Sequence, residues 1–183
     1  MPKILILTGD AGESYEALYG VHRFQEAGWQ TVIAAPVKRR LHLVMHDFEP
    51  GWDTYIERAG YSLEADIAID QVNPADYEAL LILGGRAPEY LRHNPKVIEI
   101  TQAFSKAGKW IFSICHGIQI LAAAGLTQGK SVTCYENCRV DAEMAGGKFG
   151  TAQAVRDGRI ITAQTWQSHP EFYREIFACL GAQ

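Results

Sequence analysis

The sequence lacks the features that mark secreted and membrane proteins. The apolar run at residues 4–7 is too short for the hydrophobic region of a signal peptide, and no small-residue cleavage site follows it. No stretch approaches the roughly 18 apolar residues that a membrane helix needs. The chain has only 4 cysteines in 183 residues, too few for a disulfide scaffold, and no Asn-x-Ser/Thr acceptor. We therefore expect a cytoplasmic protein that does not bind membranes.

An excess of charge of one sign is also absent. The 17 basic and 21 acidic side chains leave a net charge of −4, which gives no electrostatic footprint for nucleic acid. The three consecutive basic residues at 38–40 are too few to make such a patch. No glycine-rich phosphate loop of the Walker or Rossmann type occurs. We therefore expect no nucleic-acid partner.

What the sequence does contain is a globular composition and an alternation of strand and helix patterns. Hydrophobic residues make up 48% of the chain and charged residues 21%, which is ordinary for one globular domain spanning residues 1–183. Apolar runs predict buried strands at 3–8, 30–35, 80–83 and 110–114. Spacing and capping residues predict helices at 14–27, 95–107, 117–124 and 168–180.

Three further segments complete this pattern. Residues 37–62 have no regular pattern, and such segments are usually functional or hold short extra strands. Residues 63–72 alternate as an edge strand does. Asp157-Gly158 predicts a hairpin turn between strands at 152–156 and 159–163.

The order of these elements predicts an α/β fold, a doubly wound three-layer sandwich with a mostly parallel sheet. Ligands of such sheets bind outside the carboxyl ends of the strands. The loops after Thr8, Leu83 and Ile114 should therefore share one edge of the sheet. Their residues become candidates for a single site.

Cys115 is the most informative residue of these loops. It follows a buried strand directly and a helix begins beside it, which is the layout of a nucleophile elbow. Gly117 lets the backbone turn without a side-chain clash. The positive end of the helix dipole favours thiolate over thiol, so we predict a lowered pKa and a thiolate population at neutral pH. Backbone N–H groups of the elbow could hold a developing oxyanion.

Two other residues could serve this cysteine. Glu13 lies in the loop after the first strand, where a protonated carboxyl could donate a hydrogen bond to the thiolate and then move protons. Without Cys115, Glu13 would be explained as a helix first-turn residue. His116 is adjacent to the nucleophile, but neighbouring residues on a helix point in different directions. We therefore expect it to pair with a carboxylate such as Glu89, or with a neighbouring subunit, instead of reaching the thiol.

The remaining candidates are weaker. Gly84-Gly85 allows a ligand to approach the backbone closely, although glycines also simply make turns. Cys134 and Cys138 have no histidine or cysteine pair beside them in the sequence, so ordinary thiols are expected there and no metal site. Cys179 is expected to lie in the core.

Together these residues resemble one known superfamily. The run Ser-Ile-Cys-His-Gly at 113–117, the run Gly-Gly-Arg-Ala-Pro-Glu at 84–89 and Glu13 resemble the ThiJ/PfpI superfamily of the Parkinsonism-associated deglycase and the PfpI intracellular peptidase. The resemblance covers nearly the whole chain. The residues at 46–48, 54–55 and 169–172 are most similar to the plant branch associated with glyoxalase III activity.

The resemblance implies a flavodoxin-like fold and specific roles. Cys115 would be the nucleophile and Glu13 the glutamate that contacts its thiol. In the peptidase branch His116 would act with Glu89 supplied by a neighbouring subunit, so a homo-oligomer is expected. No metal or organic cofactor is implied. The residues expected to bind a small aldehyde substrate are Gly84, Gly85, Arg86, Gly117, His46 and His169.

Four functions remain open from the sequence. The first is a cofactor-free glyoxalase or deglycase that attacks 2-oxoaldehydes such as methylglyoxal with Cys115 and moves the proton with Glu13. The second is a peptidase built on Cys115, His116 and Glu89. The third is a redox-responsive stress protein or chaperone. The fourth, a class I glutamine amidotransferase pairing Cys115 with His169 and Glu171, is disfavoured because Ser113 replaces the glycine of that elbow.

Overall fold

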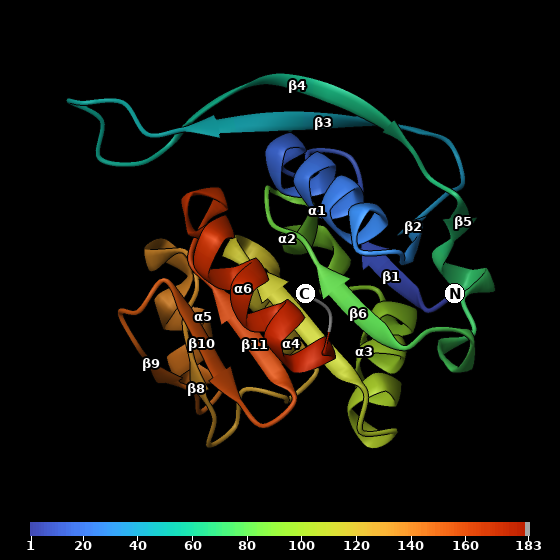
Figure 1. Ribbon diagram of the computed structural model, residues 1–183. Helices are drawn as coiled ribbons and strands as arrows, with labels where there is room; N and C mark the ends of the chain where they lie inside the picture. Colours follow the sequence, from blue (N-terminus) through green and yellow to red (C-terminus); the bar gives the residue numbers. More distant parts are fainter. Residues whose placement is uncertain (182–183) are drawn as a thin grey trace.

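A seven-stranded sheet forms the centre of the protein (Figure 1). The computed structural model describes residues 1–181. The strand order is β10-β11-β7-β6-β1-β2-β5, and every neighbouring pair is parallel except β10 with β11. The strands are β1 Lys3–Leu7, β2 Gln30–Ala35, β5 Ile67–Ala68, β6 Ala79–Ile82, β7 Trp110–Ile114, β10 Ala154–Asp157 and β11 Ile160–Ala163. The predicted mostly parallel sheet and the hairpin at Asp157-Gly158 are confirmed.

The inner strands are apolar because helices cover both faces of the sheet. Every residue of β6 and β11 is buried. The first residue of β1 is exposed and the first residue of β7 is half-buried, while the other residues of both strands are buried. A strand buried on both faces gains from apolar side chains at successive positions, not at alternate ones. This is why short apolar runs located these strands in the sequence to within one residue.

The helices pack on the two faces. Helices α1 and α6 lie together on one face, while α3 and α4 lie on the other (Figure 1). Phe24 of α1 is fully buried and its ring lies 5.2 Å from that of Phe177 of α6. The helices are α1 Ser14–Glu26, α2 Ala87–Leu91, α3 Pro95–Lys106, α4 Ile118–Ala123, α5 Arg139–Met144 and α6 His169–Leu180. The predicted three-layer sandwich is therefore confirmed.

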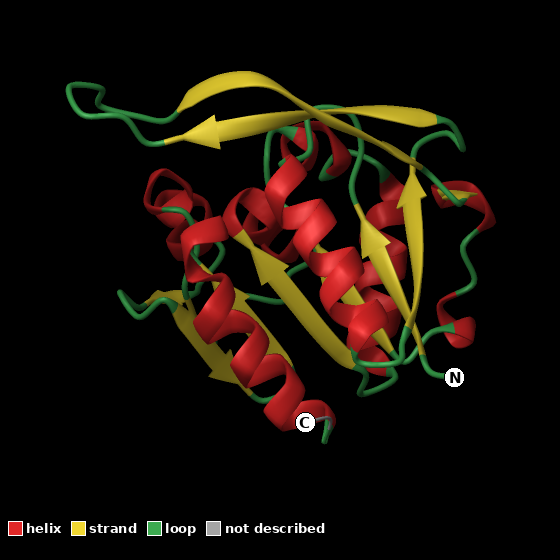
Figure 2. Ribbon diagram, turned by 45° about the horizontal axis from the view of Figure 1, so that its top comes forward, coloured by secondary structure: helices red, strands yellow, loops and turns green. Residues whose placement is uncertain are grey.

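The segment at 37–62, which has no regular sequence pattern, holds extra strands, one of the two alternatives expected for it. It forms most of an antiparallel hairpin of β3 Arg40–Asp47 and β4 Ile56–Glu64, which crosses above α1 and extends past the sheet (Figures 1 and 2). Its alternation is hard to see because β4 is mostly exposed and a register shift interrupts the pairing between His42 and Val44. The edge strand predicted at 63–72 is reduced to β5, which does lie at an edge of the sheet.

Several short elements were not predicted. Helices α2 and α5 and the two-residue strands β8 Ser131–Val132 and β9 Lys148–Phe149 are too short to show a period. Single turns of 3-10 helix occupy 69–71, 74–76, 115–117, 136–138 and 166–168. Among residues 1–181, no helix is both long and apolar enough to cross a membrane.

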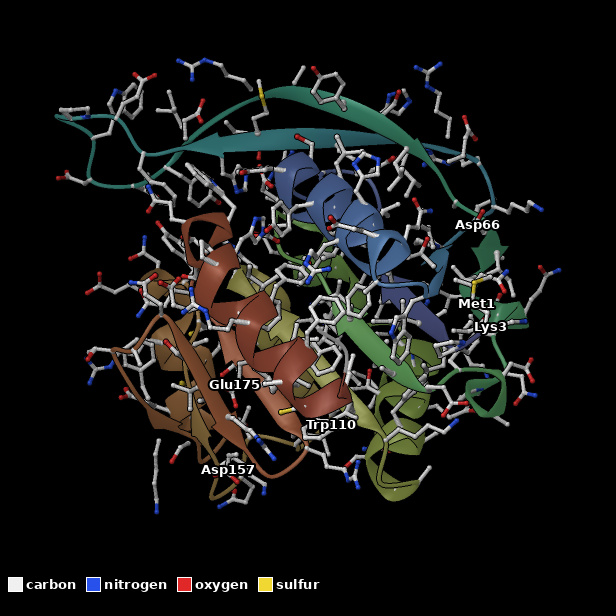
Figure 3. The ribbon with its side chains drawn as sticks, viewed as in Figure 1. Met1, Lys3, Asp66, Trp110, Asp157 and Glu175 are labelled. Carbon is white, nitrogen blue, oxygen red and sulfur yellow. The ribbon has the colours of Figure 1, made fainter. Side chains whose placement is uncertain are left out.

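The two ends of the sheet differ in what surrounds them. Trp110, at the start of β7, and Asp157, beside the turn after β10, lie far from the hairpin (Figure 3). The Arg156 and Arg159 guanidinium groups lie over the Trp110 ring, and Lys130 pairs with Asp157 at 2.9 Å. The opposite end, where the parallel strands finish, is the end that the hairpin covers (Figure 2). The candidate residues gather there.

Candidate active site

Cys115 occupies a sharp turn between β7 and α4. Its φ is +58°, a conformation that costs a non-glycine residue free energy of order 1–3 kcal/mol and marks functional sites. The side chain is 5% exposed. A Cβ on Gly117 would lie 2.7 Å from Ser113 Oγ and 2.8 Å from the Ile82 carbonyl oxygen, so only glycine fits there. The predicted nucleophile elbow is present. Gly117 allows its backbone to turn, but it has no side chain that could contact a substrate.

The loop after β6 brings a second backbone segment against the thiol. A Cβ on Gly84 would lie 2.6 Å from Cys115 Cβ, so the close approach requires glycine. The backbone N–H groups of Gly85 and His116 lie beside the Cys115 side chain and act to lower the pKa of its thiol. Backbone N–H groups next to a nucleophile are the kind of donor that can stabilise a developing oxyanion. Gly84 and Gly85 therefore place backbone against Cys115, and their contact with a substrate stays a prediction.

The glutamate beside the thiol is Glu16, and the prediction of Glu13 is wrong. Glu16 has no exposed surface; its Oε2 accepts from the Gly84 N–H at 2.7 Å, and its carboxyl is close enough to Cys115 for its charge to raise the pKa of the thiol. Burial and the neighbouring charge of Glu13 raise the pKa of Glu16 well above its usual value. Glu13 and Glu16 are three positions apart, Glu13 at the N-cap of α1 and Glu16 in its first turn.

Glu13 instead holds the backbone. Its Oε2 accepts from the Glu16 N–H at 2.7 Å, which makes it the N-cap of α1. Its Oε1 accepts from the His46 N–H at 3.4 Å. Burial raises the pKa of the Glu13 carboxyl, while these N–H donors act against the rise. Glu13 thus joins the loop after β1 to the hairpin.

His116 reaches the thiol, contrary to expectation. Its Nδ1 lies 3.4 Å from Cys115 Sγ. The helical argument fails because the positive φ of Cys115 turns that residue out of the helical path. Burial, followed by the nearby His46, lowers the pKa of His116 to about 4, so its imidazole is neutral at neutral pH. Within residues 1–181 of this chain, the exposed Glu89 makes no hydrogen bond to His116; a contact across subunits stays a prediction.

The predicted lowering of the Cys115 pKa is not what the structure indicates. Burial, and then the charge of Glu16, raise the pKa of the thiol well above its usual value, while the N–H groups of His116 and Gly85 act in the opposite direction. The helix dipole argument overlooked how completely the elbow is enclosed. The resting form of Cys115 is therefore the thiol, and it must lose its proton as it attacks.

We expect this to appear in the alkylation of Cys115. The rate of reaction with iodoacetamide should rise with a pH midpoint above about 8.5, the ordinary value of a cysteine thiol. The rate at each pH is read from the mass of the peptide that carries Cys115. A midpoint below about 7 would restore the thiolate predicted from the elbow.

Three side chains join the hairpin to the loop after β6. His46 Nε2 donates to Glu57 Oε2 at 2.8 Å, and Arg86 donates to both oxygens of Glu57, from Nε at 2.7 Å and from Nη2 at 2.9 Å. Arg86, Glu57 and His46 therefore form one network. The Arg86 guanidinium, which was expected to bind substrate, is paired with Glu57. The pKa of Glu57 falls to about 2, first because of Arg86.

Aromatic rings surround this network. The Tyr55 ring stacks on His46 with centroids 3.9 Å apart, and the Tyr135 ring stacks on His116 at 5.3 Å. Thr54 Oγ1 lies 3.3 Å from the Tyr135 hydroxyl, so the hairpin is also tied to the segment after β8. The sequence analysis did not assign Glu57, and the signal for it was the strand pairing that places it directly opposite His46.

A cavity of about 280 Å³ lies between α1 and the hairpin. Its wall is mostly apolar, and Cys115 is not among the lining residues, which are Glu13, Ser14, Tyr15, Leu18, Met45, His46, Asp47, Tyr61 and Trp166. Trp166 Nε1 donates to the His46 carbonyl oxygen at 2.8 Å and closes one side. Glu13 and His46 connect this cavity to the residues around the thiol.

His169 lies apart from the thiol. Its ring stacks on Tyr19 with centroids 4.5 Å apart and meets Tyr15 edge-on at 5.1 Å. It is 2% exposed, and burial lowers its pKa to about 4. Glu171 is exposed. His116, not His169, is beside the sulfur, so the Cys115–His169–Glu171 arrangement of an amidotransferase does not form, and His169 is part of the packing of α1 against α6.

The other cysteines are free thiols. Cys134 and Cys138 are buried and Cys179 is half-buried on α6, not within the core as predicted. In the part of the chain that the structure describes, no group of three His, Cys, Asp or Glu side chains is arranged to hold a metal ion.

Comparison with known proteins identifies the family. The model of the DJ-1/PfpI family matches residues 2–179. The chain belongs to the DJ-1/PfpI family. Drosophila melanogaster DJ-1beta superimposes with a TM-score of 0.78 at 20% identity, covering 96% of this chain and 88% of that one. This agrees with the flavodoxin-like sandwich expected from the sequence.

Several DJ-1/PfpI relatives are similar in sequence. Protein DJ-1 homolog D of Arabidopsis thaliana is 37% identical over 99% of this chain but only 48% of its own length. A deglycase of Pyrococcus horikoshii is 36% identical over 88% of this chain and 89% of its own. Protein/nucleic acid deglycase 2 of Escherichia coli is 30% identical over 98% of both. The chain thus spans about half the length of the Arabidopsis relative and most of the other two.

Proposed function

We propose that this member of the DJ-1/PfpI family is a cofactor-independent enzyme of the glyoxalase and deglycase type. The observation that carries the proposal is the position of Cys115, which lies between the Glu16 carboxyl, His116 Nδ1 and two backbone N–H donors. A nucleophile, a proton carrier and an oxyanion site are the groups that this chemistry needs. Relatives named deglycases support the same assignment.

The reaction with a 2-oxoaldehyde uses these groups in order. The Cys115 sulfur forms a bond to the aldehyde carbon as the thiol proton passes, through His116 Nδ1, to the aldehyde oxygen. The product is a hemithioacetal. The N–H groups of Gly85 and His116 stabilise the oxygen while it is negative. Neutral His116 suits this step, because an imidazolium could not accept the proton.

Glu16 then moves a proton between carbon atoms. In its ionised form it removes the hydrogen from the former aldehyde carbon and returns a proton to the adjacent carbonyl carbon, while the hydroxyl proton passes to the oxygen of that adjacent carbon, which leaves a thioester. A carboxylate with a raised pKa is a stronger base than an ordinary one, which favours this step. Water then cleaves the thioester, giving a 2-hydroxy acid and the free thiol. Early glyoxal adducts of amines or thiols would be hydrolysed by the same groups.

A peptidase is the second candidate. The 3.4 Å separation of His116 Nδ1 and Cys115 Sγ favours it, because this pair is the core of a cysteine peptidase. Its third member would be Glu89 of a neighbouring subunit, as the resemblance implies. The homo-oligomer that this requires stays a prediction.

One assay separates the two candidates. Purified protein is incubated with methylglyoxal and, separately, with a fluorogenic peptide. We expect lactate from methylglyoxal without any added thiol or metal, and little release from the peptide. Peptide cleavage without lactate would favour the peptidase. Neither product would contradict both functions.

A further inference from the structure

Two tyrosine rings pack against the imidazole of His116. The Tyr135 ring stacks on it with an interplanar angle of 28° and centroids 5.3 Å apart. The Tyr55 ring meets it edge-on, at 80° and 5.8 Å. Tyr55 and Tyr135 also contact each other, with centroids 5.6 Å apart. His116 is only 6% exposed, and these two rings supply part of the apolar surface that covers it.

Contacts with the hairpin hold both rings in place. The Tyr135 hydroxyl accepts from Asn137 Nδ2 at 2.8 Å and lies 3.3 Å from Thr54 Oγ1. The Tyr55 ring stacks on His46 with centroids 3.9 Å apart. Thr54 and Tyr55 lie directly before β4, and His46 belongs to β3. The hairpin therefore carries one of the two rings and contacts the hydroxyl of the other.

Burial outweighs the charges around the His116 imidazole. The titratable side chains on the elements packed around it are Cys115, Glu16 across the thiol, His46, Tyr55, Tyr135, Glu89 and Arg92 of α2, and Asp141 of α5. Asp141 acts to raise the pKa of His116, but it accepts from Gln119 Nε2 at 2.9 Å and from Arg92 Nη1 at 3.4 Å. Burial is the largest influence on this pKa and lowers it, so the cover over the ring decides its charge.

We propose that Tyr55 and Tyr135 are positioning residues that act through His116. Their rings hold His116 Nδ1 against the Cys115 sulfur and exclude water from the imidazole, so that it stays neutral and can accept the thiol proton. The hairpin then sets how far the pH can fall before the reaction stops. This inference deepens the proposed function and rests on it for the reaction that uses the proton.

Removing one ring should let water reach the imidazole and stabilise its cation. A buried histidine has a lowered pKa because its charged form is poorly solvated, so exposure returns the pKa toward the ordinary value of about 6.5. In Tyr55→Ala and Tyr135→Ala the pKa of His116 should therefore rise from about 4 by at least about one pH unit. Tyr55→Phe keeps the ring and loses only the hydroxyl, so the pKa should stay near the wild-type value.

Histidine NMR measures this without turnover. The Cε1–H signal of His116, assigned from its loss in His116→Gln, is followed from about pH 7 down to about pH 5, the range in which an ordinary histidine gains its charge. We expect the signal to stay unmoved in the wild-type protein and in Tyr55→Phe, and to titrate in the two alanine variants. Trp52→Leu is the matched control, because it removes a 62% exposed ring from the same hairpin, and it should behave as the wild-type protein does.

The pH dependence of kcat/KM for methylglyoxal gives a second readout. In the alanine variants the loss of activity at acid pH should begin at a higher pH, because an imidazolium cannot accept the thiol proton. The variants should therefore lose more activity at acid pH than at alkaline pH. A site that was merely distorted would lose activity to the same extent across the pH range.

A wild-type His116 that titrates near 6.5, the ordinary value, would overturn the inference without any variant. So would a His116 signal that stays unmoved in both alanine variants, or one that moves as much in Tyr55→Phe or Trp52→Leu as in Tyr55→Ala, because the enclosing rings would then not matter. If the wild-type protein makes no lactate, the proposed function fails, while the NMR titration still decides whether the two rings keep His116 neutral.

Discussion

Cys115→Ser is expected to reduce the formation of lactate from methylglyoxal to the uncatalysed background. Serine has nearly the same shape and can occupy the same turn, so the fold should remain. Its hydroxyl is a far weaker acid than a thiol, and the neutral His116 beside it has a pKa of about 4, too low to activate it. Lactate release by the variant, measured at the enzyme concentration used for the wild-type protein, checks this.

Cys179→Ser provides the control for this change. Cys179 lies on α6, half-buried, and its sulfur donates to Glu175 Oε1 at 3.9 Å. This variant should retain full activity. Residual turnover of the Cys115→Ser variant above about one part in a hundred would indicate that the sulfur is not the nucleophile, and the covalent scheme would have to be abandoned.

The elbow could be predicted because its signals are local. β7 is a run of five residues ended by the cysteine, and the glycine at 117 follows from the closeness of Ile82 and Ser113. The same reasoning placed the loop at 84–85 on the same edge of the sheet. Topology alone brings these two loops together once the strands are known to be parallel.

The choice between Glu13 and Glu16 could not be made from spacing. The two carboxylates lie at the start of α1, Glu13 at its N-cap and Glu16 in its first turn, and both are buried. What separates them is the direction of their side chains: Glu13 turns back to cap the helix, while Glu16 crosses to Gly84 and the thiol. That difference depends on where the loop after β6 lies, which is a tertiary contact 68 residues distant in sequence.

The hairpin was missed for a different reason. Its two strands form a two-stranded sheet of their own, β4 is largely exposed, and neither shows clean alternation. Yet this hairpin supplies His46 and Glu57, so periodicity could not reveal this part of the candidate site. Only the register, with His46 opposite Glu57, shows that two polar residues 11 apart in the sequence act together.

Glu16→Gln should lower the turnover of methylglyoxal by about 10²–10⁴-fold, the contribution of a positioned acid–base group. Glutamine retains the size of the side chain and can still accept from the Gly84 N–H, but it cannot take up and return a proton. Glu13→Gln should cost no more than about tenfold, the size of one hydrogen bond, because Glu13 holds the backbone of Glu16 and His46. Steady-state kinetics of both variants gives the order.

Thiol reactivity separates loss of the proton carrier from simple damage to the site. The charge of Glu16 raises the pKa of Cys115, so removing that charge should move the alkylation midpoint of Glu16→Gln to lower pH. The variant would then have a more reactive sulfur and a much slower turnover, a combination that a distorted site would not produce. If Glu13→Gln proves the slower of the two enzymes, or if Glu16→Gln turns over normally, the proton is carried by Glu13, and the contact between Glu16 and the thiol serves only to position it.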